Sequence, residues 1–231
     1  MRLFDLFYPT LCLHCGDLSE ALFCKSCQTL IELLEPKDRC VTCFGEKEDG
    51  TLTCKSCRFE REEVVMMGAL FEYLGPMMSL TRSLKFKKMG YLAKNVAPFF
   101  VVQLEKIGWE WPDLVTYVPR NWFKNLLRGY NQSYLLARAF CQLTRLPLLP
   151  LLKQKGESFS QIKLSKKERR KLPVSQFQLK KGGSLFGKNI LIIDDVITTG
   201  ATGRACAAVL RGGDPKEIRV MALCRAGSKD S

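Results

Sequence analysis

The chain has 231 residues, which is enough for one domain of ordinary size together with a small one. Hydrophobic residues make up 46% of it, enough for a packed core, and no run approaches the roughly 18 apolar residues of a membrane span. The first eight residues include Arg2 and Asp5 and lack the apolar core of a signal peptide, so we expect a cytoplasmic protein.

The net charge of +13 is unevenly distributed along the chain. Residues 1–62 hold 8 basic and 11 acidic side chains, whereas residues 63–231 hold 28 basic and 12 acidic ones. We predict two domains, residues 1–62 and 63–231, because the cysteine-rich part ends at Glu62-Glu63, and the basic surface belongs to the second. The basic excess of the second favours polyanionic partners such as phosphates or nucleic acid. The alternative is a solubilising surface around a locally basic phosphate pocket.

The N-terminal part is dominated by cysteines. Eight of the eleven fall into four Cys-x-x-Cys pairs: Cys12/Cys15, Cys24/Cys27, Cys40/Cys43 and Cys54/Cys57. Two intervening residues allow both thiolates of a pair to reach one tetrahedral ion, so four pairs supply two Cys₄ zinc sites. We therefore predict a double zinc-ribbon module in residues 1–62. Disulfides are the alternative, and the lack of a signal peptide argues against them.

The grouping of the four pairs is not determined by their spacing. Sequential grouping joins the first two pairs and the last two, and a cross-braced grouping joins first with third and second with fourth. We favour the sequential one, because each half then forms a short ribbon with a small loop. His14 lies inside the first pair and is predicted to be a turn residue rather than a ligand. So small a segment needs metal in order to fold.

The middle of the chain predicts alternating strands and helices. Strands are expected at 64–73 and 114–118, and helices at 76–87, 91–107 and 133–146. Between them lie Pro119-Arg120 and the run Arg128-Gly129-Tyr130-Asn131-Gln132. The guanidinium groups of Arg120 and Arg128 match phosphate oxygens, and Gly129 allows a close backbone approach. A plain basic surface loop is the alternative. Trp122 and Phe123 form either a core plug or a platform for base stacking.

The C-terminal part contains the most informative stretch. Strands are expected at 148–152 and 174–179, with a segment rich in Ser, Gln and Lys at 157–171. The apolar run 190–193 predicts a buried strand, followed by Asp194 and Asp195, the turn Thr198-Thr199-Gly200-Ala201-Thr202, a helix at 203–211 and a strand at 218–224. Backbone N–H groups of the turn and of the helix N-terminus favour an anion. The carboxylates suit sugar hydroxyls and Mg²⁺.

This stretch closely resembles the phosphoribosyl-pyrophosphate (PRPP) motif of type I phosphoribosyltransferases. The resemblance implies an α/β fold, a parallel sheet flanked by helices. It assigns Asp194 and Asp195 to the ribose hydroxyls and residues Thr198, Thr199, Gly200, Ala201 and Thr202 to the 5′-phosphate. It also assigns Arg120, Arg128 and Gly129 to the pyrophosphate, which Mg²⁺ accompanies. Segment 157–171 matches the closing loop of that family in position, but Leu172 stands where an asparagine is usual.

The cysteine pairs, Leu84-Lys85-Phe86, Arg128-Gly129-Tyr130-Asn131-Gln132 and the Asp194–Gly200 stretch together resemble the ComF family, which also contains GntX-type proteins. The resemblance covers nearly the whole chain. It implies PRPP binding, a role in DNA uptake and competence (transformation), contact with single-stranded DNA, and a competence helicase as a further partner. The alternative is an active PRPP- and Mg²⁺-dependent phosphoribosyltransferase, of the glycosyltransferase class, in nucleotide salvage. No base-binding segment for its nitrogen acceptor is recognisable, so catalysis is left open.

Overall fold

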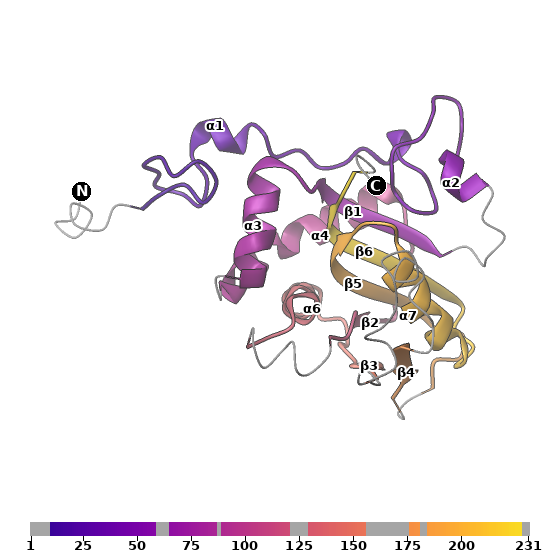
Figure 1. Cartoon of the computed structure of the whole chain (residues 1–231). Helices are drawn as coiled ribbons and strands as arrows, with labels where there is room; N and C mark the ends of the chain where they lie inside the picture. The colour runs from indigo at the N-terminus through magenta and orange to yellow at the C-terminus, as the bar shows by residue number, and fades with distance from the viewer. Residues whose placement is uncertain are drawn as a thin grey trace, which may run out of the picture.

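The computed structural model describes residues 10–58, 65–86, 89–120, 129–155, 176–180 and 184–227. Its centre is a four-stranded parallel sheet in the order β1-β6-β5-β2 (Figure 1). The strands are β1 (Met66–Glu72), β2 (Leu114–Tyr117), β5 (Asn189–Ile197) and β6 (Glu217–Arg225). A separate antiparallel pair consists of β3 (Leu152–Gln154) and β4 (Phe177–Leu179). The predicted fold class, a parallel α/β sheet with flanking helices, is confirmed. The predicted domain boundary at 62/63 lies outside the described residues.

Helices cover both faces of this sheet. On one face lie α3 (Gly75–Phe86), α4 (Ala93–Ile107) and α6 (Gln132–Thr144), packed with Leu191 and Ile193 of β5. On the other face α7 (Ala201–Arg211) packs with Ile190 and Ile192. Burial on both faces explains why this strand is an unbroken apolar run. No helix in the described part of the chain combines the length and apolar character needed to cross a membrane.

Two predicted strands have the wrong bounds. We expected the central strand to end at Ile193, but β5 continues through both aspartates to Ile197. It does so because its pairing with β6 continues, with Asp194 opposite Ala222 and Ile197 opposite Arg225. The strand expected at 148–152 is also displaced: Leu148 makes only an isolated bridge to Val115, and β3 starts at Leu152. The intervening Pro150 has no N–H to donate to a ladder.

The cysteine-rich segment lies along the α/β body (Figure 1). It contains two short helices, α1 (Lys25–Gln28) and α2 (Lys55–Arg58), which begin directly after Cys24 and Cys54. A 3₁₀ turn, η2 (Pro36–Asp38), lies between them. The first half packs against α3, where His14 Nδ1 lies 3.0 Å from Ser79 Oγ. The second half packs against β1, where the backbone N–H of Met67 donates to the carbonyl of Thr42 at 2.9 Å. A second 3₁₀ turn, η3 (Gly90–Leu92), precedes α4.

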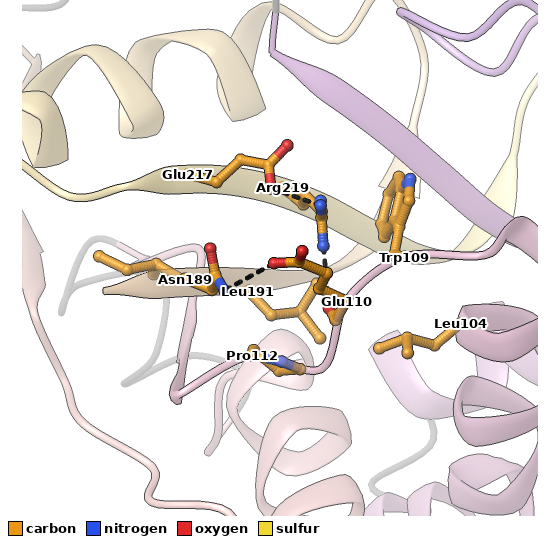
Figure 2. A pocket seen from close by; sticks show the side chains of 9 residues that line it. Leu104, Trp109, Glu110, Pro112, Asn189, Leu191, Glu217 and Arg219 are labelled. Carbon is orange, nitrogen blue, oxygen red and sulfur yellow. Dashed lines mark hydrogen bonds and ion pairs between the residues drawn. The ribbon is translucent and has the colours of Figure 1, made fainter. Parts of the chain in front are cut away.

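The edge of the sheet where β5 and β6 begin is closed by polar contacts (Figure 2). Arg219 Nη1 donates to the carbonyl of Glu110 at 2.8 Å, and Asn189 Nδ2 donates to the Glu110 carboxylate at 3.2 Å. The Arg219 guanidinium also lies 5.6 Å from the ring centre of Trp109. The cavity beside these residues holds only about 10 Å³, the space of a single water, so it is too small for a metabolite.

Candidate functional site

The carboxyl ends of the neighbouring parallel strands β2 and β5 meet at one place on the sheet, which is called the β2–β5 crevice below. These two strands are neighbours, yet the helix after β2 (α6) covers one face and the helix after β5 (α7) covers the other. In open parallel sheets, ligands bind at the carboxyl ends of the strands where successive connections leave on opposite faces. The topology alone therefore points to the edge that carries Asp194 and Asp195.

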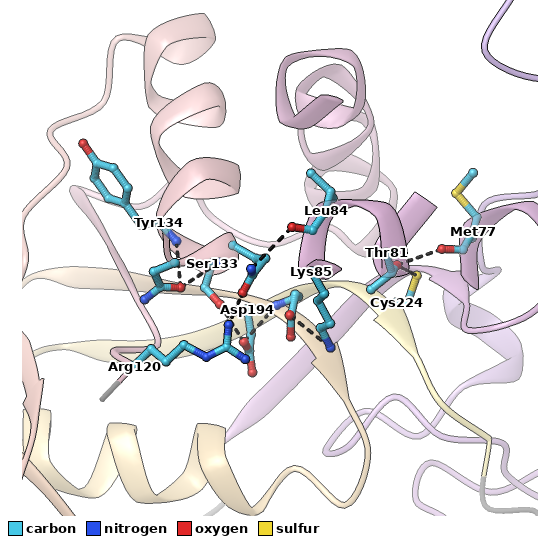
Figure 3. Close-up of polar contacts among 12 residues, drawn as sticks. Met77, Thr81, Leu84, Lys85, Arg120, Ser133, Tyr134, Asp194 and Cys224 are labelled. Carbon is cyan, nitrogen blue, oxygen red and sulfur yellow. Dashed lines mark hydrogen bonds and ion pairs between the residues drawn. The ribbon is translucent and has the colours of Figure 1, made fainter. Parts of the chain in front are cut away.

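The two aspartates are held by different partners (Figure 3). Asp194 is 9% exposed, and its Oδ1 accepts hydrogen bonds from the hydroxyl of Ser133 at 2.9 Å and from the N–H of Asp195 at 2.8 Å. Asp195 forms an ion pair with Lys85, at 3.1 Å between Oδ2 and Nζ. The pair thus has one buried, hydrogen-bonded carboxylate and one more accessible carboxylate with a cationic partner.

Burial, and after it the neighbouring charge of Asp195, raise the pKa of Asp194 from 3.8 to about 7. Hydrogen bonds from the Asp195 N–H and the Ser133 hydroxyl oppose this shift, as does the charge of Lys85. Near neutral pH, this carboxyl therefore exchanges between a protonated form and an ionised one. A cationic or hydroxyl-bearing ligand in the crevice stabilises the ionised form.

Arg120 follows β2 and enters the same crevice. Its Nη1 donates to Oε1 of Gln132, and Figure 3 shows the guanidinium group turned toward Asp194. The first turn of α6 is held by Asn131, whose side-chain oxygen accepts from the N–H groups of Ser133 and Tyr134. The amide of Asn131 also donates to the carbonyl of Val118 at 3.0 Å, which ties α6 to the end of β2.

The loop that follows β5 has the geometry of an anion site. Thr198 and Thr199 are exposed, and Gly200 caps α7 in the left-handed conformation with φ of +78°. A Cβ at Gly200 would lie 2.7 Å from Sδ of the buried Met67, so another residue here would have to displace the end of that side chain as well as adopt a left-handed backbone. The first turn of α7 presents N–H groups without intrahelical partners, and the threonines add hydroxyl donors.

The eight paired cysteines form two clusters. The first cluster is Cys12, Cys15, Cys24 and Cys27, and the second cluster is Cys40, Cys43, Cys54 and Cys57; within each, all four Sγ atoms lie within 4.8 Å of one another. This is the sequential grouping. None of the eight forms a disulfide: the Sγ atoms of Cys15 and Cys24 are 3.6 Å apart, and those of Cys43 and Cys54 are 3.7 Å apart. Sulfur atoms about 2.3 Å from a tetrahedral zinc lie about 3.8 Å from each other, so the clusters fit this ion.

One thiol in each cluster, that of Cys12 and that of Cys40, has a lowered pKa. Burial raises the pKa of Cys12, but backbone N–H groups, those of Cys15 and Cys24 foremost, outweigh it and lower the pKa to about 6. Backbone N–H groups of Cys43 and Cys54 likewise outweigh burial and lower the pKa of Cys40 to about 7. Because metals bind the thiolate form, these backbone groups favour metal binding.

The structure brings together some of the predicted site residues. Asp194, Asp195 and Arg120 share the crevice, and residues 198–202 follow directly from β5. Gly129 is exposed with φ of +82°, a conformation that favours glycine. Arg128, Trp122, Phe123 and segment 157–171 lie outside the described residues.

Three residues of the crevice received no role from the sequence. Lys85 stands in the Leu-Lys-Phe motif, Gln132 ends the Arg-Gly-Tyr-Asn-Gln motif, and Ser133 follows it. Their positions in or next to these motifs were the only indication in the sequence that they belong to the site. What they contact becomes visible only when α3 and α6 are packed beside β5.

The chain is similar in sequence to known proteins. Residues 153–231 match the family model "Phosphoribosyl transferase domain". The chain is 27% identical to Competence protein F of Haemophilus influenzae over 229 residues, 95% of this chain and 99% of that protein. It is 27% identical to Competence protein ComFC of Streptococcus pneumoniae over 208 residues, 89% of each. It is also 24% identical to the DNA utilization protein YhgH of Escherichia coli over 203 residues, 82% of this chain and 85% of that protein.

Proposed function

Since the chain is a ComF-type protein with a phosphoribosyltransferase domain, we propose that it binds PRPP with Mg²⁺ in the β2–β5 crevice and acts in DNA uptake and competence. The observation that carries the proposal is the arrangement of the acid pair. Asp194 is buried and hydrogen-bonded, and Asp195 follows it. The loop with Thr198, Thr199 and Gly200 comes shortly after them and leads into the N-terminus of α7. Ribose hydroxyls need hydrogen-bond acceptors and the 5′-phosphate needs donors, and the chain supplies carboxylates first and N–H and hydroxyl groups next.

Each part of PRPP has a partner in this arrangement. The carboxylates of Asp194 and Asp195 accept hydrogen bonds from the ribose hydroxyls. The N–H groups and hydroxyls of residues 198–202 (Thr198, Thr199, Gly200, Ala201, Thr202) hold the 5′-phosphate. Arg120 and Arg128 hold the pyrophosphate, and Gly129 lets the backbone approach it. Carboxylate oxygens are ligands that Mg²⁺ prefers, and the ion supplies positive charge to the pyrophosphate when bound.

Calorimetric titration of the zinc-loaded protein with PRPP and Mg²⁺ tests this site. We expect the double variant Asp194→Asn/Asp195→Asn to lose at least about 100-fold in affinity, because each lost hydrogen bond to a charged group contributes about 1.5 kcal/mol or more. Asp49→Asn is the control, since Asp49 is an exposed carboxylate in the cysteine-rich segment. Unchanged affinity in the double variant would refute the site.

A groove beside the crevice supports contact with single-stranded DNA. It encloses about 540 Å³ between the start of α4 and α6, and Tyr91, Lys94, Tyr130, Arg138 and Gln142 line it. Tyr91 is 63% exposed, and none of the described lining residues is acidic. The hydroxyl of Tyr130 donates to the carbonyl of Leu84 at 2.8 Å, next to Lys85 of the crevice. Aromatic rings stack on bases and the cations contact phosphates, so the groove suits a strand without sequence preference.

Fluorescence anisotropy with a labelled oligothymidylate across a salt series tests this surface. Lys94→Gln/Arg138→Gln removes two cations from the groove, and Lys25→Gln/Lys37→Gln removes two exposed ones from the cysteine-rich segment. We expect only the groove variant to weaken binding, with the slope of log affinity against log salt reduced by about 1.4, or about 0.7 for each lost phosphate contact. An equal effect of both variants would show that only net charge matters and would refute the groove.

An active phosphoribosyltransferase is the second candidate, because the Arg120 guanidinium group is turned toward Asp194, where a cation can stabilise the leaving pyrophosphate. Catalysis of this kind depends on positioning and on charge stabilisation of the leaving pyrophosphate. Pyrophosphate release is therefore to be measured with PRPP and a panel of nucleobases. Release stimulated by one base would establish a transferase of nucleotide salvage, and its absence across the panel would favour a binding role.

A further inference from the structure

Arg225, the last residue of β6, is a buried cation with an unusual set of partners. It is 7% exposed. Its Nη1 donates to the carbonyl groups of Ile197 (3.2 Å), Thr198 and Ala226 (2.6 Å), and its Nε donates to the carbonyl of Cys43 at 3.1 Å. Its Nη2 lies 4.0 Å from Sγ of the same cysteine. The guanidinium group thus connects the loop after β5 with a residue of the second cluster.

The second cluster can supply the counter-charge that a buried guanidinium requires. The partners of Arg225 that the structure describes are carbonyl oxygens and a sulfur, not carboxylates. A buried charge is costly unless it is paired. Four thiolates around one divalent zinc carry a net charge of −2. Cys43 is one of those four, so metal loading of the second cluster stabilises the cation next to it.

Arg225 also contacts the start of residues 198–202, which are called the phosphate loop below. Thr198 is the first residue after β5, and Arg225 holds its carbonyl oxygen. In a planar trans peptide, the carbonyl and the following N–H point in opposite directions. Because the Thr198 carbonyl points at the buried Arg225, the N–H of Thr199 points away from Arg225.

The second cluster is packed closely enough to transmit this constraint. A Cβ at Gly45 would lie 3.0 Å from Nη2 of Arg225, so the backbone beside Cys43 lies against the guanidinium. Phe44 packs with Leu34 and Ala69, which anchors the cluster to β1. The first cluster packs instead with Met77 and Leu80 of α3.

We propose that Arg225 is a positioning residue for the phosphate loop, and that the second cluster, when loaded with metal, holds Arg225 in place. The identity of the bound phosphate compound rests on the proposed function above. The arrangement of the loop does not, because the contacts of Arg225 exist without a ligand. Metal loss from the second cluster should therefore loosen the loop, whereas metal loss from the first should not.

The test compares one ligand variant of each cluster. Cys57→Ser disables the second cluster and Cys15→Ser the first; each is expected to remove one zinc. We expect Cys57→Ser and Arg225→Met to weaken PRPP binding by about 5- to 150-fold, the usual range of coupling between sites, and to accelerate amide hydrogen exchange in residues 198–204. Cys15→Ser should change neither property. Arg225→Lys should restore part of the protection, since lysine retains the charge but not the forked geometry.

Non-additivity provides the decisive control. If the second cluster acts on the loop through Arg225, the double variant Cys57→Ser/Arg225→Met should bind PRPP no more weakly, and exchange amide hydrogens in residues 198–204 no faster, than the more affected single variant. Equal loosening of the loop by Cys15→Ser and Cys57→Ser, or unchanged exchange in Arg225→Met, would overturn the proposal. If Arg225→Met does not fold, the comparison of Cys57→Ser with Cys15→Ser still tests the proposal, because only Cys57→Ser should accelerate hydrogen exchange in residues 198–204. If the wild-type protein binds no PRPP, the proposed function fails, while hydrogen exchange in the free protein still tests Arg225.

Discussion

Asp194 and Arg225 are charged residues buried near the ends of neighbouring strands, and the protein accommodates them differently. Asp194 is stabilised by two hydrogen bonds and remains partly protonated near neutral pH. An arginine cannot lose its proton in this way, so Arg225 needs several acceptors. One residue can therefore respond to pH, and the other holds a permanent connection.

The raised pKa of Asp194 has a consequence for stability. Its folded-state pKa of about 7 lies above the ordinary value of 3.8, so the folded protein binds the proton more tightly than the unfolded chain. The associated stability is complete below about pH 4 and is lost as the pH rises through about 7. We expect the free energy of unfolding to fall from pH 5 to pH 8 by up to about 3 kcal/mol from this group. Asp194→Asn should remove that decline.

Urea unfolding of the ligand-free protein at four pH values between 5 and 8 measures this effect. Asp113→Asn is the matched control, because Asp113 is exposed at the opposite edge of the sheet. Taking the difference between each variant and the wild type cancels the titration of all other groups. Parallel curves for Asp194→Asn and the wild type would contradict the prediction.

At the scale of elements, β5, the loop and α7 act as one unit with little freedom. The strand is paired on both sides, with β2 and β6, and α7 packs on the face formed by Ile190 and Ile192. The chain must turn from one to the other within a few residues, which brings Gly200 against Met67 of β1. The position of the phosphate loop therefore depends on the strands around it: β2 and β6, which pair with β5, and β1, which carries Met67.

Gly200→Ala tests the rigidity of this turn. We expect it to destabilise the protein by about 1–3 kcal/mol from backbone strain, with a further loss from the contact with Met67, and to weaken PRPP binding. Gly108→Ala is the matched control: Gly108 has φ of +77°, close to the +78° of Gly200, but no atom within 4 Å of its added Cβ. Urea unfolding of both variants separates strain from contact, and equal losses would rule out the contribution of Met67.

At the scale of the whole molecule, the cysteine-rich segment braces the α/β body at two places. The first cluster lies against α3, and the second against β1 and the end of β6. An ion pair between Arg39 and Glu72, the last residue of β1, adds another link between the cysteine-rich segment and the α/β body. In this arrangement, the metal sites support elements that meet at the crevice, although no cysteine of either cluster enters it.

Metal content can be measured directly. We expect two zinc ions per chain by elemental analysis, with one remaining in Cys57→Ser and in Cys15→Ser, and two in Cys141→Ser, whose cysteine belongs to neither cluster. Removing both ions with a chelator should lower the thermal midpoint, because a small cysteine-rich segment depends on metal for its folding. Two zinc ions retained in Cys57→Ser would contradict the ligand assignment.

The sequence by itself determined the features that depend on local spacing. The order Asp194, Asp195, Thr198 to Thr202 and then a helix is visible along the chain, because strand, turn and helix signals are read from neighbouring residues. The four cysteine pairs are visible for the same reason. Helices α3, α4 and α6 lie within a few residues of their predicted bounds, since the spacing of their buried residues follows the helical repeat.

Only the tertiary structure decided which distant residues meet at these motifs. Ser133 and Asp194 are separated by 61 positions, and Arg225 and Cys43 by 182, so no periodic pattern relates them. Lys85 reaches Asp195 because α3 and β5 pack together, and β5 outlasts its apolar run because β6 continues to pair with it. These contacts follow from which strands are neighbours in the sheet, a long-range property that local propensity does not contain.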